Sequence, residues 1–227
     1  MAAPHLNFWR LPEHVLEYLA IADTIPHRIE GEGVLLECLP SHVSRVLDLG
    51  SGDGRLLALV KLARPGVNAV AIDFSPPMLE RLRERFIADA SVEVMVHDLD
   101  EPLPSSLGTF DAVVSSFAIH HLPHERKRAL YEEIFRLLNP GGAFMNLEHV
   151  ASPTRLLHEQ FLAALNLAPE DEDPSNKLLD LESQLDWLRA TGFSHVDCHW
   201  KWRELALLAG LKSDSAAKTS PSTLPRS

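Results

Sequence analysis

The chain has little cysteine, no excess of basic residues and no long apolar run. Its only two cysteines, Cys38 and Cys198, form no Cys-x-x-Cys pair, which argues against a zinc site and fits a reducing compartment. The net charge of −11 disfavours nucleic acid, which usually requires a basic surface. No apolar stretch approaches the roughly 20 residues of a membrane span, and the N-terminus lacks the pattern of a signal peptide. We expect a cytoplasmic protein with neither a nucleic-acid nor a membrane partner.

A glycine-rich turn is the most informative positive feature of the chain. An apolar strand at residues 46–49 runs into Gly50, Gly52 and Gly54 and then into a helical pattern. Glycines allow a tight turn and a close approach of the backbone to a ligand. Asp48 at the strand end favours a ligand that brings an ammonium group or hydroxyls, because a pyrophosphate on the next helix N-terminus would meet a like charge. The turn therefore predicts a nucleotide-type cofactor other than NAD.

Three further strands also end in polar residues, which a glycine pattern alone would not explain. The second apolar run, 67–72, ends at Asp73, roughly 20 residues after Gly52, where a Rossmann-type sheet places a carboxylate against ribose hydroxyls. The strand at 92–96 ends at His97-Asp98-Leu99, and the strand at 110–114 ends at Ser115-Ser116. We expect these strand ends to meet at one edge of a single sheet.

Five ordered motifs together resemble a known family. They are VLDLGSGDGRLL at 46–57, AIDFSPPMLE at 71–80, VHDLDEPLP at 96–104, FDAVVSSFAIHHL at 110–122 and LLNPGGAFMNLEHV at 137–150. With them, the chain resembles the class I S-adenosylmethionine-dependent methyltransferases of the small-molecule type over about residues 40 to 210. The resemblance implies an enzyme that transfers a methyl group from S-adenosylmethionine to a small-molecule acceptor, with O, N, S and C nucleophiles all left open.

The resemblance also implies a fold and a domain organisation. The expected fold is α/β, a Rossmann-like, doubly wound seven-stranded sheet, mostly parallel with an antiparallel last strand and with helices on both faces. A single methyltransferase domain would span residues 1–211, with an N-terminal helical cover at 1–40 and a helical substrate cover at 151–190. Its acidic stretch at 169–174 reads as a solvated loop. The segment 212–227, rich in Ser, Thr, Pro and Ala, is predicted to be disordered. The oligomeric state is open between monomer and homodimer.

Cofactor-binding residues follow from the resemblance position by position. The methionine moiety would lie against the first turn, Asp73 would hold the ribose hydroxyls, Phe74 and Met78 would flank the adenine, and Asp98 with the Leu99 backbone would bind its amino edge. Ser115 would lie beside the methionine moiety near the sulfonium. The residues expected at the cofactor are Asp48, Gly50, Ser51, Gly52, Asp73, Phe74, Met78, Asp98, Leu99 and Ser115.

Methyl transfer is an in-line displacement, so a base is needed only where the nucleophile must lose a proton. The candidates are His120, His121, Glu148 and His149, all of which follow strands at the edge where open α/β sheets bind ligands. Of the two adjacent histidines, His121 is expected to be the packing residue, which leaves His120, Glu148 and His149 as the predicted catalytic residues. Ligands spread over two strand ends are weak support for a metal, and no metal site is predicted.

Other functions remain open on the sequence. A relative that uses S-adenosylmethionine for carboxymethyl transfer or cyclisation would share every cofactor motif. An NAD-dependent oxidoreductase would share the glycine turn and Asp73, although no tyrosine–lysine pair stands at dehydrogenase spacing. A non-catalytic cofactor-binding subunit would bind without turnover. Their products or ligands distinguish these possibilities.

Overall fold

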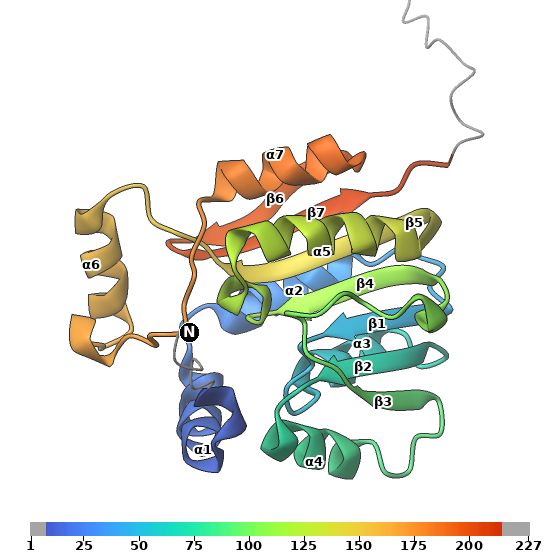
Figure 1. The fold of residues 1–227 in the computed structure, drawn as a ribbon, viewed down its shortest axis with the longest axis horizontal. Coiled ribbons are helices and arrows are strands. Elements are labelled where there is room, and N and C mark those ends of the chain that lie inside the picture. The colour runs from blue at the N-terminus through green and yellow to red at the C-terminus, as the bar shows by residue number, and fades with distance from the viewer. Residues whose placement is uncertain (1–7, 215–227) are drawn as a thin grey trace, which may run out of the picture.

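A single seven-stranded sheet organises the chain (Figure 1). The structure is a computed structural model that describes residues 8–214. The strand order is β3-β2-β1-β4-β5-β7-β6, and all neighbouring pairs are parallel except those that β7 makes with β5 and β6. The strands are β1 (Arg45–Leu49), β2 (Asn68–Asp73), β3 (Val92–Val96), β4 (Phe110–Ser116), β5 (Leu138–His149), β6 (Ser194–Trp202) and β7 (Leu205–Leu211). This confirms the predicted Rossmann-like sheet.

Helices cover both faces of the sheet because their apolar stripes need a partner. On one face lie α2 (Arg28–Cys38), α3 (Arg55–Ala63) and α4 (Pro76–Arg85), whose leucines pack on the small and β-branched residues of β1 and β2. On the other face lie α5 (His124–Leu137) and α7 (Leu181–Thr191), packed on a core that contains Phe110 and Phe144. The central strands are buried on both sides, as expected for parallel strands under two helical layers.

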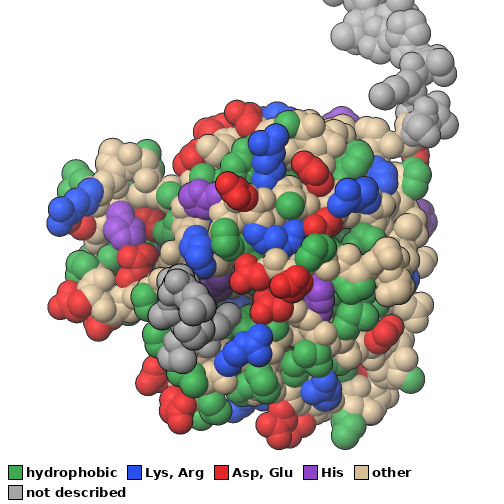
Figure 2. Space-filling view, in the orientation of Figure 1, with side chains coloured by type: hydrophobic (Ala, Val, Ile, Leu, Met, Phe, Trp, Pro, Cys, Tyr) green, Lys and Arg blue, Asp and Glu red, His purple; other side chains and the backbone are tan. Residues whose placement is uncertain are grey.

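Two segments lie outside this sandwich. Helix α1 (Pro12–Ile21) lies near the carboxyl ends of the strands, and α6 (Arg155–Ala164) projects beside the sheet at the left of Figure 1. Phe161 and Leu162 of α6 form a small satellite core with Leu205 of β7. Figure 2 shows acidic and basic side chains interspersed over the face presented there.

The element boundaries differ little from those predicted. Strand β4 continues through Ser116, and β5 already begins at Leu138, before the Pro140-Gly141-Gly142 turn, because Leu138 pairs with Phe110 ahead of a bulge. The predicted disordered tail lies, from residue 215 onward, outside the described residues. Within the described part of the chain, no helix is both long and apolar enough to cross a membrane.

Candidate cofactor and substrate cavity

A cavity of about 1310 Å³ opens at the carboxyl ends of β1, β2 and β4. Its walls come from the glycine turn after β1, the ends of β2 and β4, the loop after β3, the N-terminal helices and the segment after η5 (Pro169–Asp171). Open α/β sheets bind ligands at the carboxyl ends of the strands, at the point where the strand order reverses, which here lies between β1 and β4. The sequence-predicted cofactor residues therefore meet at this edge, with one exception described below.

The glycine turn is shaped by packing on both sides. Gly50 has φ of +64°, and a Cβ built there would lie 2.3 Å from the Ala118 Cβ. Gly54 has φ of +83°, and a Cβ there would lie 2.6 Å from Leu82 of α4. Both conformations and both contacts exclude a side chain. The turn is thereby held against the loop after β4 and against α4, which fixes one wall of the cavity.

Asp48 places a buried carboxylate in this wall. The residue is 1% exposed, and neither carboxylate oxygen has a hydrogen-bond partner among the described residues. The nearby Ser51 hydroxyl donates instead to the Asp48 backbone carbonyl, at 2.8 Å. Burial raises the pKa of Asp48 to about 7; the nearby Ser51 hydroxyl counteracts the rise, and the negative charges of Asp73 and Asp53 add to it. Buried charges ordinarily have partners, so this carboxylate fits a ligand that brings an ammonium group.

Asp73 is fixed by the backbone around it. Its two carboxylate oxygens accept hydrogen bonds from the amides of Gly52 and Ser75, each at 2.8 Å. Burial raises its pKa, while those two amides and that of Phe74 counteract the rise. A carboxylate oxygen retains further acceptor capacity. Asp73 thus presents a rigid acceptor to the cavity, as hydroxyls of a sugar require.

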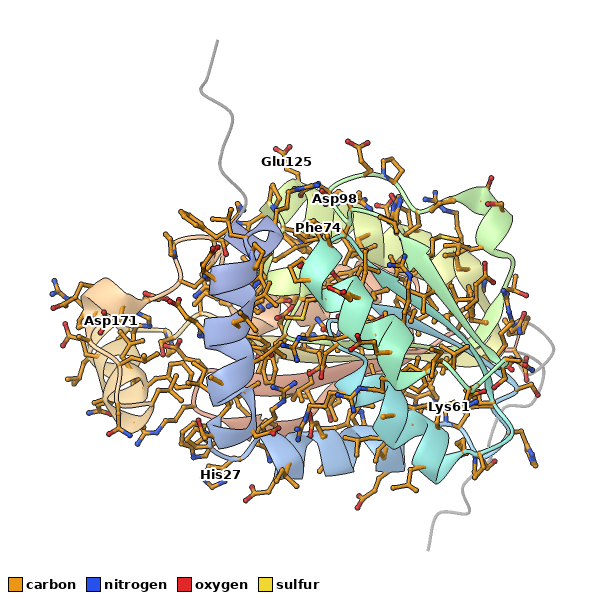
Figure 3. The ribbon with its side chains drawn as sticks, turned by 90° about the horizontal axis from the view of Figure 1, so that it is seen from below. His27, Lys61, Phe74, Asp98, Glu125 and Asp171 are labelled. Atoms are coloured by element: carbon orange, nitrogen blue, oxygen red, sulfur yellow. The ribbon has the colours of Figure 1, made fainter. Side chains whose placement is uncertain are left out.

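The third part of the wall comes from β3 and the start of α4. Figure 3 shows Phe74 and Asp98 on the same side of the molecule, at the beginning of α4. Arg10 lies over the Phe74 ring, with its Cζ 5.2 Å from the centroid, and its Nη2 lies 3.3 Å from an Asp98 oxygen. Met78 and Leu99 complete this apolar region and are nearly fully buried. This part of the cavity wall therefore combines the apolar side chains of Phe74, Met78 and Leu99 with the polar groups of Arg10 and Asp98.

Ser115 and Ser116 differ in where they point. The Ser115 hydroxyl donates to the Leu49 carbonyl at 2.8 Å inside the sheet, and Ser115 is not among the residues lining the cavity. Ser116 lines the cavity, and its buried hydroxyl has no partner among the described residues. Alternation along β4 explains the difference, because successive side chains face opposite sides of a strand.

The three predicted catalytic residues lie behind the cavity wall and do not line it. His120 Nδ1 is 2.7 Å from Glu148 Oε1, and burial lowers the pKa of His120 while it raises that of Glu148. The contact distance would suit an ion pair, but burial of both groups favours their neutral forms. His149 Nε2 lies 2.9 Å from Glu204, which also contacts His158 of α6 at 3.0 Å. This network joins β5, β7 and α6.

The N-terminal segment supplies an aromatic wall. Trp9 and Tyr18 line the cavity with their rings 5.1 Å apart in an edge-to-face arrangement. Arg28 also lines it, but its guanidinium is engaged by Glu32 at 2.9 Å, by the Tyr18 hydroxyl and by a backbone carbonyl. Glu32 in turn receives a bidentate pair from Arg55, at 2.8 and 2.9 Å. Arg28 therefore acts mainly as a brace for this wall.

The cavity also includes residues whose place in it the sequence did not fix. His121, expected to be a packing residue, lines the cavity beside Trp9, with ring centroids 5.3 Å apart. Pro174, Ser175 and Lys177, from the end of the acidic stretch and the residues after it, also line the cavity. The doubled histidine was the signal for His121. Residues 151–190 were predicted to be a substrate cover, but the acidic residues at 169–174 were interpreted as a solvated loop. No group of three or more ligating side chains suited to a metal occurs among residues 8–214.

The fold and the cavity define a Rossmann-like enzyme that binds an adenosyl-type cofactor at the strand ends. Comparison with known proteins agrees. Residues 46–142 match the family model of the methyltransferase domain. The chain is 33% identical over 168 residues to a demethylmenaquinone methyltransferase of Clavibacter sepedonicus, covering 67% of this chain and 66% of that relative. It is 26% identical to a carboxy-S-adenosyl-L-methionine synthase of Klebsiella pneumoniae, covering 93% of this chain and 94% of that relative.

Solved structures support the same fold. An O-methyltransferase family protein from Burkholderia thailandensis superposes with a TM-score of 0.72 at 19% identity, covering 91% of this chain and 62% of that one. Human N-acetylserotonin methyltransferase, solved with S-adenosylmethionine, gives 0.68 at 18% identity, covering 94% and 61%. The chain belongs to the class I S-adenosylmethionine-dependent methyltransferases, and the cofactor of this family is S-adenosylmethionine.

Proposed function

We propose that this enzyme transfers the methyl group of S-adenosylmethionine to a small-molecule acceptor bound in the same cavity. The observation that supports this most is the Asp48 carboxylate, buried without a partner beside the glycine turn. An ammonium ligand supplies the opposite charge that this site lacks, and the amino-acid part of S-adenosylmethionine brings one. The nicotinamide cofactors bring a pyrophosphate instead, which an unpaired carboxylate repels.

The remaining residues have proposed roles that follow the geometry. Gly50, Ser51 and Gly52 form the backbone cradle for the amino-acid part. Asp73 accepts hydrogen bonds from the ribose hydroxyls, and the region formed by Phe74, Met78, Asp98 and Leu99 holds the adenine. Ser116, rather than Ser115, presents a hydroxyl to the cavity near this cradle. When bound, the cofactor supplies an electrophilic methyl group on a sulfonium.

The acceptor is proposed to be a small molecule. The cavity of about 1310 Å³ exceeds the roughly 300–1,000 Å³ of an ordinary ligand pocket, which leaves room for an acceptor beside the cofactor. The part of the cavity wall that includes Trp9, Tyr18 and Phe117 is aromatic and suits an apolar or planar molecule. Burial of the acceptor there would exclude water from the transfer. We place the enzyme in the cytoplasm, which fits its two free cysteines. Its oligomeric state is proposed to be a monomer or a homodimer.

Calorimetric titration with S-adenosylmethionine, S-adenosylhomocysteine and NAD tests the proposal. We expect both adenosyl ligands to bind and NAD to bind far more weakly. A screen of metabolites with S-adenosylmethionine should then yield S-adenosylhomocysteine with one acceptor class. Preferential binding of NAD would contradict the proposal.

A second candidate is formation of a carboxymethyl sulfonium, in which the S-methyl group loses a proton and forms a C–C bond to a carboxyl carbon from a co-substrate; one specific observation favours it. The match to the carboxy-S-adenosyl-L-methionine synthase of Klebsiella pneumoniae runs over 93% of this chain, whereas the match to the demethylmenaquinone methyltransferase covers 67%. The two reactions leave different products, since methyl transfer leaves a thioether and carboxymethyl transfer retains a sulfonium. Mass spectrometry of the cofactor after incubation with each candidate co-substrate distinguishes them.

A further inference from the structure

A second histidine of the doubled pair occupies the position that a proton acceptor requires. His121, in the 3-10 turn η4 (Ile119–His121), lines the cavity, whereas His120 and His149 do not. Its Nδ1 lies 2.8 Å from Ser175 Oγ, and no described residue forms a hydrogen bond with its Nε2. Because Nδ1 is already occupied, Nε2 is the ring nitrogen available to a ligand.

The ring of His121 is held in place from several sides. It packs on the His120 ring with centroids 4.0 Å apart and on Trp9 at 5.3 Å. The loop that provides Ser175 is tied to the same turn, because the Lys177 amide donates to the His120 carbonyl at 2.9 Å and the Lys177 ammonium donates to the His121 carbonyl at 2.6 Å. A group fixed in this way needs little reorganisation when a ligand arrives.

Burial keeps the His121 imidazole neutral at physiological pH. Burial lowers its pKa well below the usual value, and its neighbour His120 adds to this. Two carboxylates lie near it, Asp173 before Ser175 and Glu148 on β5. The cationic groups nearby are Lys127 on α5 and Lys177, and His14 on α1 has its Nε2 3.6 Å from an Asp173 oxygen. The carboxylates raise the pKa but do not outweigh burial. A neutral imidazole has a lone pair that accepts a proton, and the lowered pKa makes His121 a weaker base than a solvent-exposed histidine.

We infer that His121 is the general base of this cavity and that the acceptor presents an acidic hydroxyl, a phenol or an enol, on a planar apolar body. The inference rests on the proposed methyl transfer. Ser175 accepts a hydrogen bond from Nδ1–H and so keeps the lone pair on Nε2. The acceptor O–H bond breaks with its proton going to Nε2, while the oxygen forms a bond to the methyl carbon. The sulfur–methyl bond breaks, and its electron pair stays on sulfur as a neutral thioether.

The chemistry of the other nucleophiles fits these residues less well. A thiol ionises near neutral pH and an uncharged amine attacks through its own lone pair, so neither needs a neutral imidazole beforehand. A phenol with a pKa near that of tyrosine, about 10, is mostly protonated at pH 7 and gains from a nearby base. Trp9, Tyr18 and Phe117 line the cavity and together form an aromatic surface against which a planar ring packs.

The first test needs no acceptor. Nitrogen NMR of protein labelled at histidine, with S-adenosylhomocysteine bound, reports which nitrogen of each neutral imidazole carries the proton, and the spectrum of His121→Asn assigns the resonance. We expect a proton on Nδ1 and none on Nε2 at pH 7. A proton on Nε2 would overturn the assignment, because that nitrogen would then be a donor.

The second test measures turnover with a series of simple phenols of different acidity as probes. In His121→Asn the amide nitrogen replaces Nδ1 toward Ser175 while Nε2 is lost, and His42→Asn on the surface is the matched control. We expect kcat of His121→Asn to fall about 100-fold with unsubstituted phenol. With a nitrophenol that is already ionised at pH 8, the kcat of His121→Asn should be nearly equal to that of the wild-type protein. Ser175→Ala should show the same pattern to a smaller degree.

These outcomes separate the inference from the function on which it depends. Equal losses for all phenols in His121→Asn would indicate a structural role and overturn the base assignment. If the protein binds S-adenosylmethionine but methylates none of the probe phenols, the inference that the acceptor presents a hydroxyl is wrong. Failure of wild-type protein to bind S-adenosylmethionine would instead refute the proposed function itself.

Discussion

The substitution Asp48→Asn should stabilise the protein without its cofactor and weaken cofactor binding. Burial raises the pKa of Asp48 from 3.8 to about 7. Between pH 3.8 and about pH 7, the Asp48 carboxyl has lost its proton in the unfolded chain but still carries it in the folded protein. The free energy of unfolding therefore falls as pH rises through this window, and above about pH 7 the folded state contains a buried carboxylate without a partner. Asparagine has nearly the same shape as aspartate, but its side chain does not titrate in this pH range.

The size of the effect follows from the shift. One pKa unit corresponds to about 1.36 kcal/mol, so a shift of about three units costs about 4 kcal/mol when complete. Part of this cost is already present at pH 5, since that pH lies above 3.8. The stability of Asp48→Asn relative to wild type should increase by about 3 kcal/mol between pH 5 and pH 8. This difference is independent of the fixed cost of burying the new amide, which is about 1–3 kcal/mol.

Urea unfolding at pH 5 and pH 8, without cofactor, measures this change, and thermal unfolding should show a relative gain of about 6–12 °C. Asp111→Asn is the matched control, because hydrogen bonds from Asn139 and two backbone amides outweigh burial and lower the pKa of Asp111. Its substitution should destabilise the protein more at pH 8 than at low pH. A relative stability of Asp48→Asn that stays constant or falls toward pH 8, or unchanged affinity for S-adenosylmethionine, would refute the reasoning.

Three further substitutions test other parts of the cavity. Gly50→Ala should lower the free energy of unfolding by about 2–5 kcal/mol in urea, whereas Gly33→Ala on α2, where a Cβ meets nothing within 4 Å, should be neutral or stabilising. Asp73→Ala should raise the Kd for S-adenosylmethionine about 10- to 100-fold by calorimetry, and an unchanged Kd would argue against a ribose contact. Glu204→Gln should speed tryptic cleavage after Arg155 about tenfold, because α6 loses its charged anchor, and an unchanged rate would contradict this.

The architecture was predictable because its signals are local. The glycine turn, the apolar runs and the polar residue after each run fix where strands end, and parallel strands bring those ends to one edge. Asp48, Asp73 and Asp98 therefore meet at the cavity as the motifs indicated. The resemblance also implied the antiparallel last strand, which agrees with the short connection between β6 and β7, since a parallel return needs a longer crossover.

The orientation of single side chains was not predictable. Ser115 and Ser116 point to opposite sides of β4, and which of them faces the cavity depends on the register with β1. His120 and His121 lie in a 3-10 turn, whose direction comes from contacts with β5 and with the loop at Ser175. That loop follows an acidic stretch that resembles a solvated surface, and only tertiary packing brings it to the cavity.

The most direct test of the account is calorimetric titration of wild-type protein with S-adenosylmethionine and NAD at pH 6 and pH 8. If the Asp48 carboxylate pairs with the ligand ammonium, S-adenosylmethionine should bind several-fold more tightly at pH 8, because the ligand then no longer has to displace a proton from a group whose pKa is about 7. Asp48→Asn should lose this pH dependence. Tighter binding of NAD, or affinity for S-adenosylmethionine that depends on pH equally in both proteins, would contradict the central claim.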